Sequence, residues 1–192
     1  MYNIFRFDAD WNLQVSRAKR SNICATADIQ PDLGYCASQK KRYFGYKLHA
    51  VCDENAVIRL FDLSPANVHD VNYLKDVKYN LSNCRLIGDK AYISADYRAD
   101  LFTSRKMELF VPMRKNQLYG IEFSKYKRQM RKRIETLFSQ LAGQFSLNIN
   151  FAKTFQGLAV GIISKITALT MIQYLNLFVF NRSINNIKVN IS

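Results

Sequence analysis

The sequence predicts a mixed α/β fold, because alternating apolar runs come first and apolar residues at helical spacing come last. Two aromatic and β-branched runs, YFGYKLHAVC (43–52) and VIRLFDL (57–63), flank DENA and predict a β-hairpin. Two later segments carry apolar residues three and four positions apart, which mark Met130, Ile134, Leu137, Phe138 and Leu141, and then Leu158, Ile162, Ile166, Leu169 and Ile172. A chain of 192 residues is long enough to form one domain with its own core.

The other predicted elements complete the order. A first strand is predicted at 5–15 (FRFDADWNLQV), where Asp8 and Asp10 alternate with aromatic and aliphatic residues. After the hairpin come a helix at 69–78, a short strand in CRLIGD (84–89), a helix near 94–106 and a strand in ELFVP (108–112). The order β-β-β-α-β-α-β-α-α resembles the ribonuclease H-like fold, in which helices flank a mixed sheet.

The formal net charge of +13 favours a polyanionic partner, chiefly nucleic acid. The alternative is a basic solvated surface. The four cysteines show no CxxC spacing, so we expect reduced thiols in the cytoplasm. Lys165, Gln173 and Asn176 interrupt the apolar stretch at 155–180, which favours a buried amphipathic helix over a membrane span.

Two carboxylates are candidates for chemistry. Asp89 follows the apolar run of LIGDKAYIS (86–94), and ligands commonly approach open α/β sheets at the ends of their strands. Glu135 lies in RKRIETLFSQL (131–141), beside the apolar stripe of its helix. The alternatives are a turn or cap residue for Asp89 and a surface ion pair with Arg131 for Glu135.

The motifs GDKAY and RKRIETLFSQL, together with YFGYKLHAV, SPANVHD and SKITALTMIQYLN, resemble the catalytic domain of a bacterial insertion-sequence transposase of the DDE superfamily. The resemblance extends from about Ser16 to about Asn181. It implies that Asp89 and Glu135 are the second and third catalytic carboxylates, accompanied by Tyr92 and Arg131. It also implies DNA, as transposon ends and target, for a partner and allows a homodimer.

Such a family cleaves and joins DNA strands by in-line phosphoryl transfer. Two Mg²⁺ ions can activate the nucleophile and stabilise the leaving oxygen, and a few convergent carboxylates suffice to hold these hard cations. The resemblance therefore implies Mg²⁺ (or Mn²⁺) bound by Asp89 and Glu135.

A basic cluster precedes Glu135 on the same predicted helix. We expect it to contact the phosphate backbone of DNA, which positions the protein rather than specifying sequence. Its members are Lys125, Lys127, Arg128, Lys132 and Arg133. The alternative is a solvated helix face.

The first family carboxylate is missing from its expected place. The family motif resembles D-S-x-P on the first strand, and counting back from Ser16 puts its Asp on Arg6. Asp8 is a fallback candidate, but two residues along a strand displace a carboxylate by roughly 6.5 Å. We therefore divide the chain into a degraded or out-of-frame first strand (1–15), a catalytic domain (16–181) and a C-terminal tail (182–192).

Relatives carry a further helical region before the catalytic domain, so we expect an N-terminally truncated, frameshifted and inactive remnant. Two alternatives remain open: a non-catalytic basic DNA-binding domain, and an unrelated ribonuclease H-like nuclease. A nucleoid-associated location in a bacterial cytoplasm is expected for the transposase.

The frameshift hypothesis predicts a specific nucleotide sequence. Residues 6–15, RFDADWNLQV, can be encoded so that reading from the second base gives Asp-Ser-Met-Pro-Ile-Gly-Ile-Cys-Lys. We expect the gene to contain this motif in the shifted frame, with a single-base deletion near codons 15–16. Sequencing the DNA around codons 1–16 tests the hypothesis, and a shifted frame without D-S-x-P rules it out.

Overall fold

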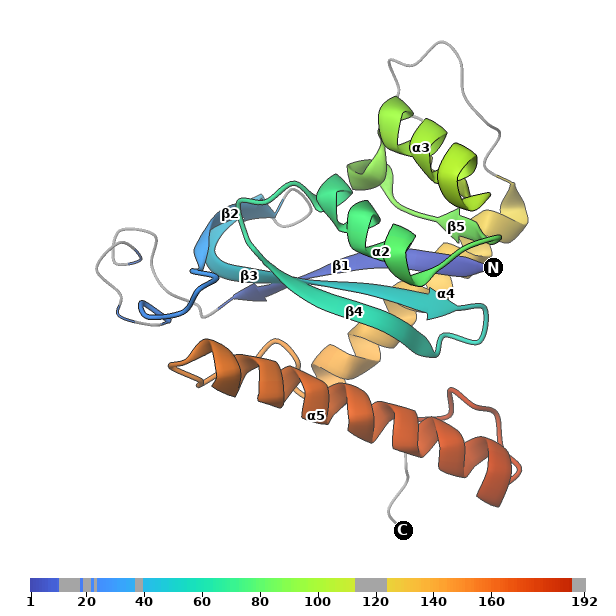
Figure 1. Ribbon diagram of the computed structural model, residues 1–192. Coiled ribbons are helices and arrows are strands. Elements are labelled where there is room, and N and C mark those ends of the chain that lie inside the picture. The colour runs from blue at the N-terminus through green and yellow to red at the C-terminus, as the bar shows by residue number, and fades with distance from the viewer. Residues whose placement is uncertain (11–17, 19–21, 23, 37–39, 113–123, 188–192) are drawn as a thin grey trace. The chain divides into compact units, whose positions relative to one another are not determined.

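The protein forms a mixed α/β fold in a computed structural model that describes residues 1–10, 18, 22, 24–36, 40–112 and 124–187 (Figure 1). The strands are β1 (Tyr2–Asp10), β2 (Asp32–Cys36), β3 (Lys41–Asp53), β4 (Ile58–Pro65), β5 (Arg85–Ile87) and β6 (Glu108–Phe110). The α-helices are α2 (Leu74–Asn80), α3 (Ala95–Arg105), α4 (Lys125–Gln144) and α5 (Phe155–Tyr174). Shorter helical turns are η1 (Asp70–Tyr73), η2 (Lys90–Tyr92) and the π-helical η3 (Leu175–Val179).

The strands pair into one mixed sheet with the order β2-β3-β1-β5-β6, and β4 pairs with β3. β1 and β5 are parallel, with Asn3 opposite Ile87, and β5 and β6 are also parallel. β2 and β3 are antiparallel, with Leu33 opposite Phe44. This mixed sheet with its helices is compatible with the ribonuclease H-like fold.

The predicted order of elements lacks one observed strand, β2. Gly34 at its centre interrupts the apolar pattern of Asp32–Cys36, but close packing requires a glycine there. A Cβ atom on Gly34 would lie 2.7 Å from the Cβ of Ala66. The strand therefore depends on a contact with a distant part of the chain, which local alternation does not reveal.

The other predicted elements occur with shifted boundaries. β1 begins before the predicted 5–15 strand, and residues 11–15 lie outside the described residues. The helix predicted at 69–78 is divided into η1 and α2. α4 and α5 both span their predicted apolar stripes.

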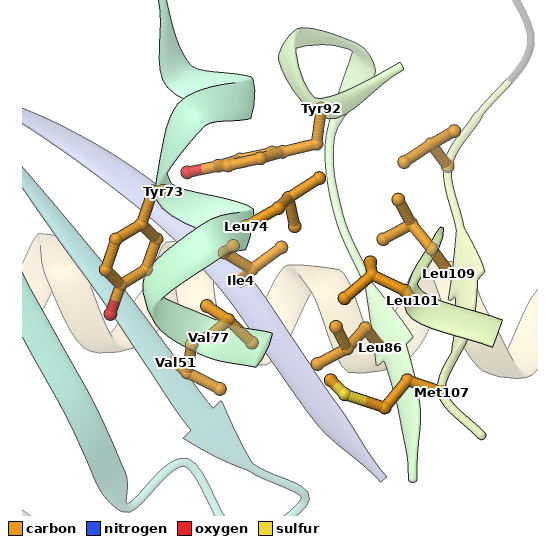
Figure 2. Packing of buried hydrophobic residues seen from close by; sticks show 11 residues of the cluster. Ile4, Val51, Tyr73, Leu74, Val77, Leu86, Tyr92, Leu101, Met107 and Leu109 are labelled. Atoms are coloured by element: carbon orange, nitrogen blue, oxygen red, sulfur yellow. The ribbon is translucent and has the colours of Figure 1, made fainter. Parts of the chain in front are cut away.

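The chain divides into two compact units. The first comprises Met1–Arg6, His49–Phe61 and His69–Thr136, and the second comprises Phe7–Leu48, Asp62–Val68 and Leu137–Ser192. The first unit has a continuous apolar core in which β1, β3, β5, β6, α2 and α3 meet (Figure 2). Its buried residues are Ile4, Val51, Tyr73, Leu74, Val77, Leu86, Tyr92, Leu101, Met107, Leu109 and Val111.

Helix α5 belongs to the second unit and begins at an N-cap, where the Thr154 hydroxyl accepts a hydrogen bond from the Gly157 amide. The Tyr46 and Phe155 rings pack with centroids 5.3 Å apart. Four of the five residues of the predicted apolar face are buried. The fifth, Ile172, is only half-buried, and the adjacent Gln173 is buried instead. The Gln173 amide donates a hydrogen bond to the Asn185 side chain, which stabilises this polar group in the interior.

The opposite face of α5 exposes apolar side chains, including Val160, Met171 and Tyr174. Among the described residues, the stretch Phe155–Val179 is the one helix that is long and apolar enough to cross a membrane. Length and composition alone are weak evidence for a span, because core helices also meet both criteria.

Asn3 is a polar residue in the interior of β1. Its side chain is 1% exposed, and neither its amide nitrogen nor its amide oxygen has a hydrogen-bond partner among the described residues. A buried amide without partners costs about 1–3 kcal/mol. This residue therefore weakens the strand that it occupies.

We predict that Asn3→Val stabilises the protein by about 1–3 kcal/mol, because it removes the unpaired amide and favours a strand. Urea denaturation measures the change in the free energy of unfolding. Arg85→Val on neighbouring β5 is the control, because Arg85 is exposed and paired with Glu108. Equal effects of both substitutions would contradict our explanation.

Candidate functional site

Asp89 lies two residues after the end of β5 and caps η2. Its Oδ1 accepts a hydrogen bond of 2.7 Å from the Ala91 amide. Burial raises the pKa of the Asp89 carboxyl above its usual value, and the nearby Asp70 carboxylate raises it further. The Ala91 hydrogen bond and the charges of Arg6 and Arg131 lower the pKa without offsetting the burial.

Arg6 and Asp70 form an ion pair beside Asp89. Arg6 Nη1 donates to Asp70 Oδ2 at 2.6 Å, and the Asp70 side chain is only 5% exposed. Arg6 extends from β1, and Asp70 begins η1 after the SPANVH segment. The structure thus places a cation and a second carboxylate within electrostatic range of Asp89.

Tyr92 connects this charged cluster to the core of the first unit. It is fully buried at one end of the core (Figure 2). Its hydroxyl oxygen lies 3.2 Å from His49 Nδ1. The His49 ring also stacks on Tyr73, with centroids 4.9 Å apart. Burial, followed by the charges of Asp70 and Asp89, raises the Tyr92 pKa well above its usual value. Tyr92 therefore remains a neutral phenol that packs under the site.

Glu135 lies on the exposed face of α4 and pairs with Arg131. Arg131 Nε and Nη2 lie 3.1 and 3.0 Å from Glu135 Oε1, so the expected i, i+4 ion pair is present. Arg131 also lowers the pKa of Asp89, as its charge lies within electrostatic range. One guanidinium therefore interacts with both predicted catalytic carboxylates.

The predicted DNA-binding cluster on α4 divides into two groups. Lys127 Nζ lies 3.6 Å from the centre of the Phe110 ring, and Arg133 Nη1 donates to the Glu54 carbonyl at 2.9 Å. Lys125, Arg128 and Lys132 are exposed, and they share one helix face with Glu135 because they are three and four residues apart. This exposed group is called the basic stripe below.

The described carboxylates do not fit a divalent cation as they stand. No three His, Cys, Asp or Glu side chains gather at a potential metal site within the described part of the chain. Instead, Arg6 pairs with Asp70, and Arg131 pairs with Glu135. A guanidinium beside a carboxylate competes with a metal ion for the same oxygens and repels it. The Asp8 side chain lies outside the described residues, so its fallback role stays a prediction.

Arg6, Asp70 and His49 belong to the site, but the sequence motifs assign no role to them. Asp70 lies in SPANVHD, and its proximity to Asp89 follows from packing between η1 and η2. Arg6 occupies the position at which the sequence predicted the first carboxylate, and this was the one sequence signal for its location. His49 appears in the alternating strand as an ordinary inward-facing residue.

We predict that Asp89→Asn stabilises the protein at neutral pH. Because the Asp89 pKa is raised in the folded state, that state binds more protons than the unfolded state at pH values between the two pKa values. The free energy of unfolding therefore falls as the pH rises through this range. The substitution removes this cost, and its advantage should shrink as the pH falls toward 3.8, the ordinary value. Urea denaturation across this range provides the measurement.

Asp96→Asn is the control for this substitution, because Asp96 is exposed in the first turn of α3, where its charge is favourable. We expect no stabilisation from this variant. An Asp89→Asn protein that is less stable than the native chain at neutral pH would contradict the prediction.

Comparison with known proteins identifies a family. A search of curated proteins found no match, and a search of solved structures found none. The family model described as "Transposase DDE domain" matches residues 17–171, which include Asp89, Tyr92, Arg131 and Glu135. The match covers most of the chain, and the chain therefore belongs to the transposase DDE domain family.

Proposed function

We propose that the chain is an insertion-sequence transposase by descent, with Asp89 and Glu135 as the remaining carboxylates of its DNA strand-transfer site. The family match across residues 17–171 is the observation that carries this proposal. The DNA substrate, the transposon ends and target, follows from the family. A cytoplasmic location near the chromosome follows from that substrate, and homodimer formation is part of the same proposal.

We further propose that the chain is a catalytically defective copy. Three points support this proposal. The family match begins at Arg17, and the count back from Ser16 puts the first family carboxylate on Arg6. The Asn3 amide in β1 has no hydrogen-bond partner within the described part of the chain. An out-of-frame strand would not have been selected for its position in the sheet. Asp8 remains the fallback for the first carboxylate.

The divalent-metal chemistry of the family is not assigned to the native chain. Mg²⁺ or Mn²⁺ bound by Asp89 and Glu135 would polarise the phosphate and activate the attacking hydroxyl. The two guanidinium groups that pair with the acidic side chains oppose such binding. Arginine side chains balance the charges of Asp70 and Glu135 without a metal ion. Phosphoryl transfer therefore does not follow from the described residues alone.

DNA binding is the activity that the surface of α4 still supports. The basic stripe of Lys125, Arg128 and Lys132 is exposed and points away from the buried face of the helix. Its charges depend on neither Asp89 nor a metal ion. A non-catalytic DNA-binding domain is therefore the second candidate function, whereas family membership leaves no observation in favour of an unrelated nuclease.

We predict that the purified chain binds duplex DNA with an affinity that falls steeply with salt. Lys132→Ala should weaken binding and reduce the salt slope by about 1, because one phosphate contact is lost. Arg133→Ala is the matched control, since its guanidinium already donates to Glu54. Fluorescence anisotropy at several salt concentrations measures both variants.

The same preparation tests the catalytic part of the proposal. We expect Asp89→Ala and Glu135→Ala to retain DNA binding, and we expect no cleavage of transposon-end DNA with Mg²⁺. Robust Mg²⁺-dependent cleavage that Asp89→Ala abolishes would overturn the defective assignment. Binding that is insensitive to salt and to Lys132 would overturn the role of the basic stripe.

A further inference from the structure

The ion pair between Arg6 and Asp70 is unusual because it is largely withdrawn from water. The side chains are 22% and 5% exposed, and the Nη1–Oδ2 distance is 2.6 Å. Removing one partner from such a pair leaves an uncompensated charge in the interior. The pair therefore differs from that of Arg59 with Asp53, in which the arginine side chain is 55% exposed.

Asp89 belongs to the same cluster of charges. The parallel register of β1 and β5 places Asn3 opposite Ile87, so Arg6 and Asp89 follow that pair by three and two residues. Arg6, in the middle of β1, therefore lies close to the level of Asp89, which follows the C-terminal end of β5. The electrostatic effects of Arg6 and Asp70 on the Asp89 carboxyl agree with this placement. Two carboxylates consequently share one adjacent guanidinium.

The chemistry of this cluster resembles that of an acidic cation site whose cation is a side chain. Neighbouring carboxylates repel each other and favour binding of a positive charge. A guanidinium provides that charge together with five hydrogen-bond donors, and it cannot lose its proton. A divalent ion would have to displace Arg6 from Asp70 and then remain beside it.

We propose that Arg6 is the built-in counter-ion of Asp70 and Asp89, and that replacing it with a carboxylate converts this end of the sheet into a divalent-cation site. The site would take a hard cation, because all its ligands would be carboxylate oxygens and water. Asp70 is a ligand of the converted site. This proposal rests on the proposed function, because Asp89 belongs to the proposed strand-transfer site and Arg6 stands where its first carboxylate is expected.

Arg6→Asp is the direct test, with Mn²⁺ as the probe and electron paramagnetic resonance as the measure of bound ion. We expect the variant to bind Mn²⁺ at least about tenfold more tightly than the native chain, because three carboxylates then converge without a side-chain cation. Adding Asp70→Asn or Asp89→Asn to the variant should remove the gain. The assay contains no DNA, so its outcome is separable from that of the proposed function.

Arg59→Asp is the matched control. It also replaces the arginine of an Arg–Asp pair with a carboxylate, but the Arg59 side chain is 55% exposed, whereas that of Arg6 is 22% exposed. We expect no gain in Mn²⁺ affinity for this control. An equal gain in Arg59→Asp, or no gain in a folded Arg6→Asp protein, would overturn the proposal.

A milder variant covers the case in which Arg6→Asp does not fold. Arg6→Gln removes the charge but retains a hydrogen-bond donor near Asp70. We expect Mn²⁺ to raise the unfolding temperature of Arg6→Gln and to leave that of the native chain unchanged, at matched ionic strength. Equal shifts in both proteins would show that Arg6 does not exclude the cation.

Discussion

Burial of negative charge at the end of β5 is the constraint on which the candidate site depends. Water is partly excluded from Asp89, so the carboxylate relies on the Ala91 amide and on two arginines for stabilisation. These groups do not fully offset the burial, as the raised pKa of Asp89 shows. A carboxylate in this condition is typical of a ligand-binding position, where the protein has not been optimised for stability alone.

Helix α4 serves two purposes because its faces differ. Its apolar face is buried at Met130, Ile134 and Leu137, which fixes the rotation of the helix. That rotation leaves Glu135 and the basic stripe exposed on one side. The position of the proposed phosphate-binding surface is thus a consequence of core packing. The neighbouring Arg133 donates instead to the Glu54 carbonyl.

Much of the fold was predictable from periodicity. Long amphipathic helices and the β3–β4 hairpin have strong local patterns, and each was found near its predicted position. β2 could not be predicted, because its central Gly34 has meaning only where Ala66 approaches it. The division of the helix predicted at 69–78 into η1 and α2 was likewise not predicted.

The sequence by itself determined the family, through motifs that contain Asp89 and Glu135, and it placed a basic cluster beside the second of them. Only the tertiary structure decided which charges meet. Arg6 and Asp70 are 64 residues apart, and they meet only because the fold brings η1 to strand β1. Electrostatic interactions depend on distances in space, whereas a sequence motif gives only the order of residues along the chain. The charges that balance one another at the site are therefore defined only by the folded structure.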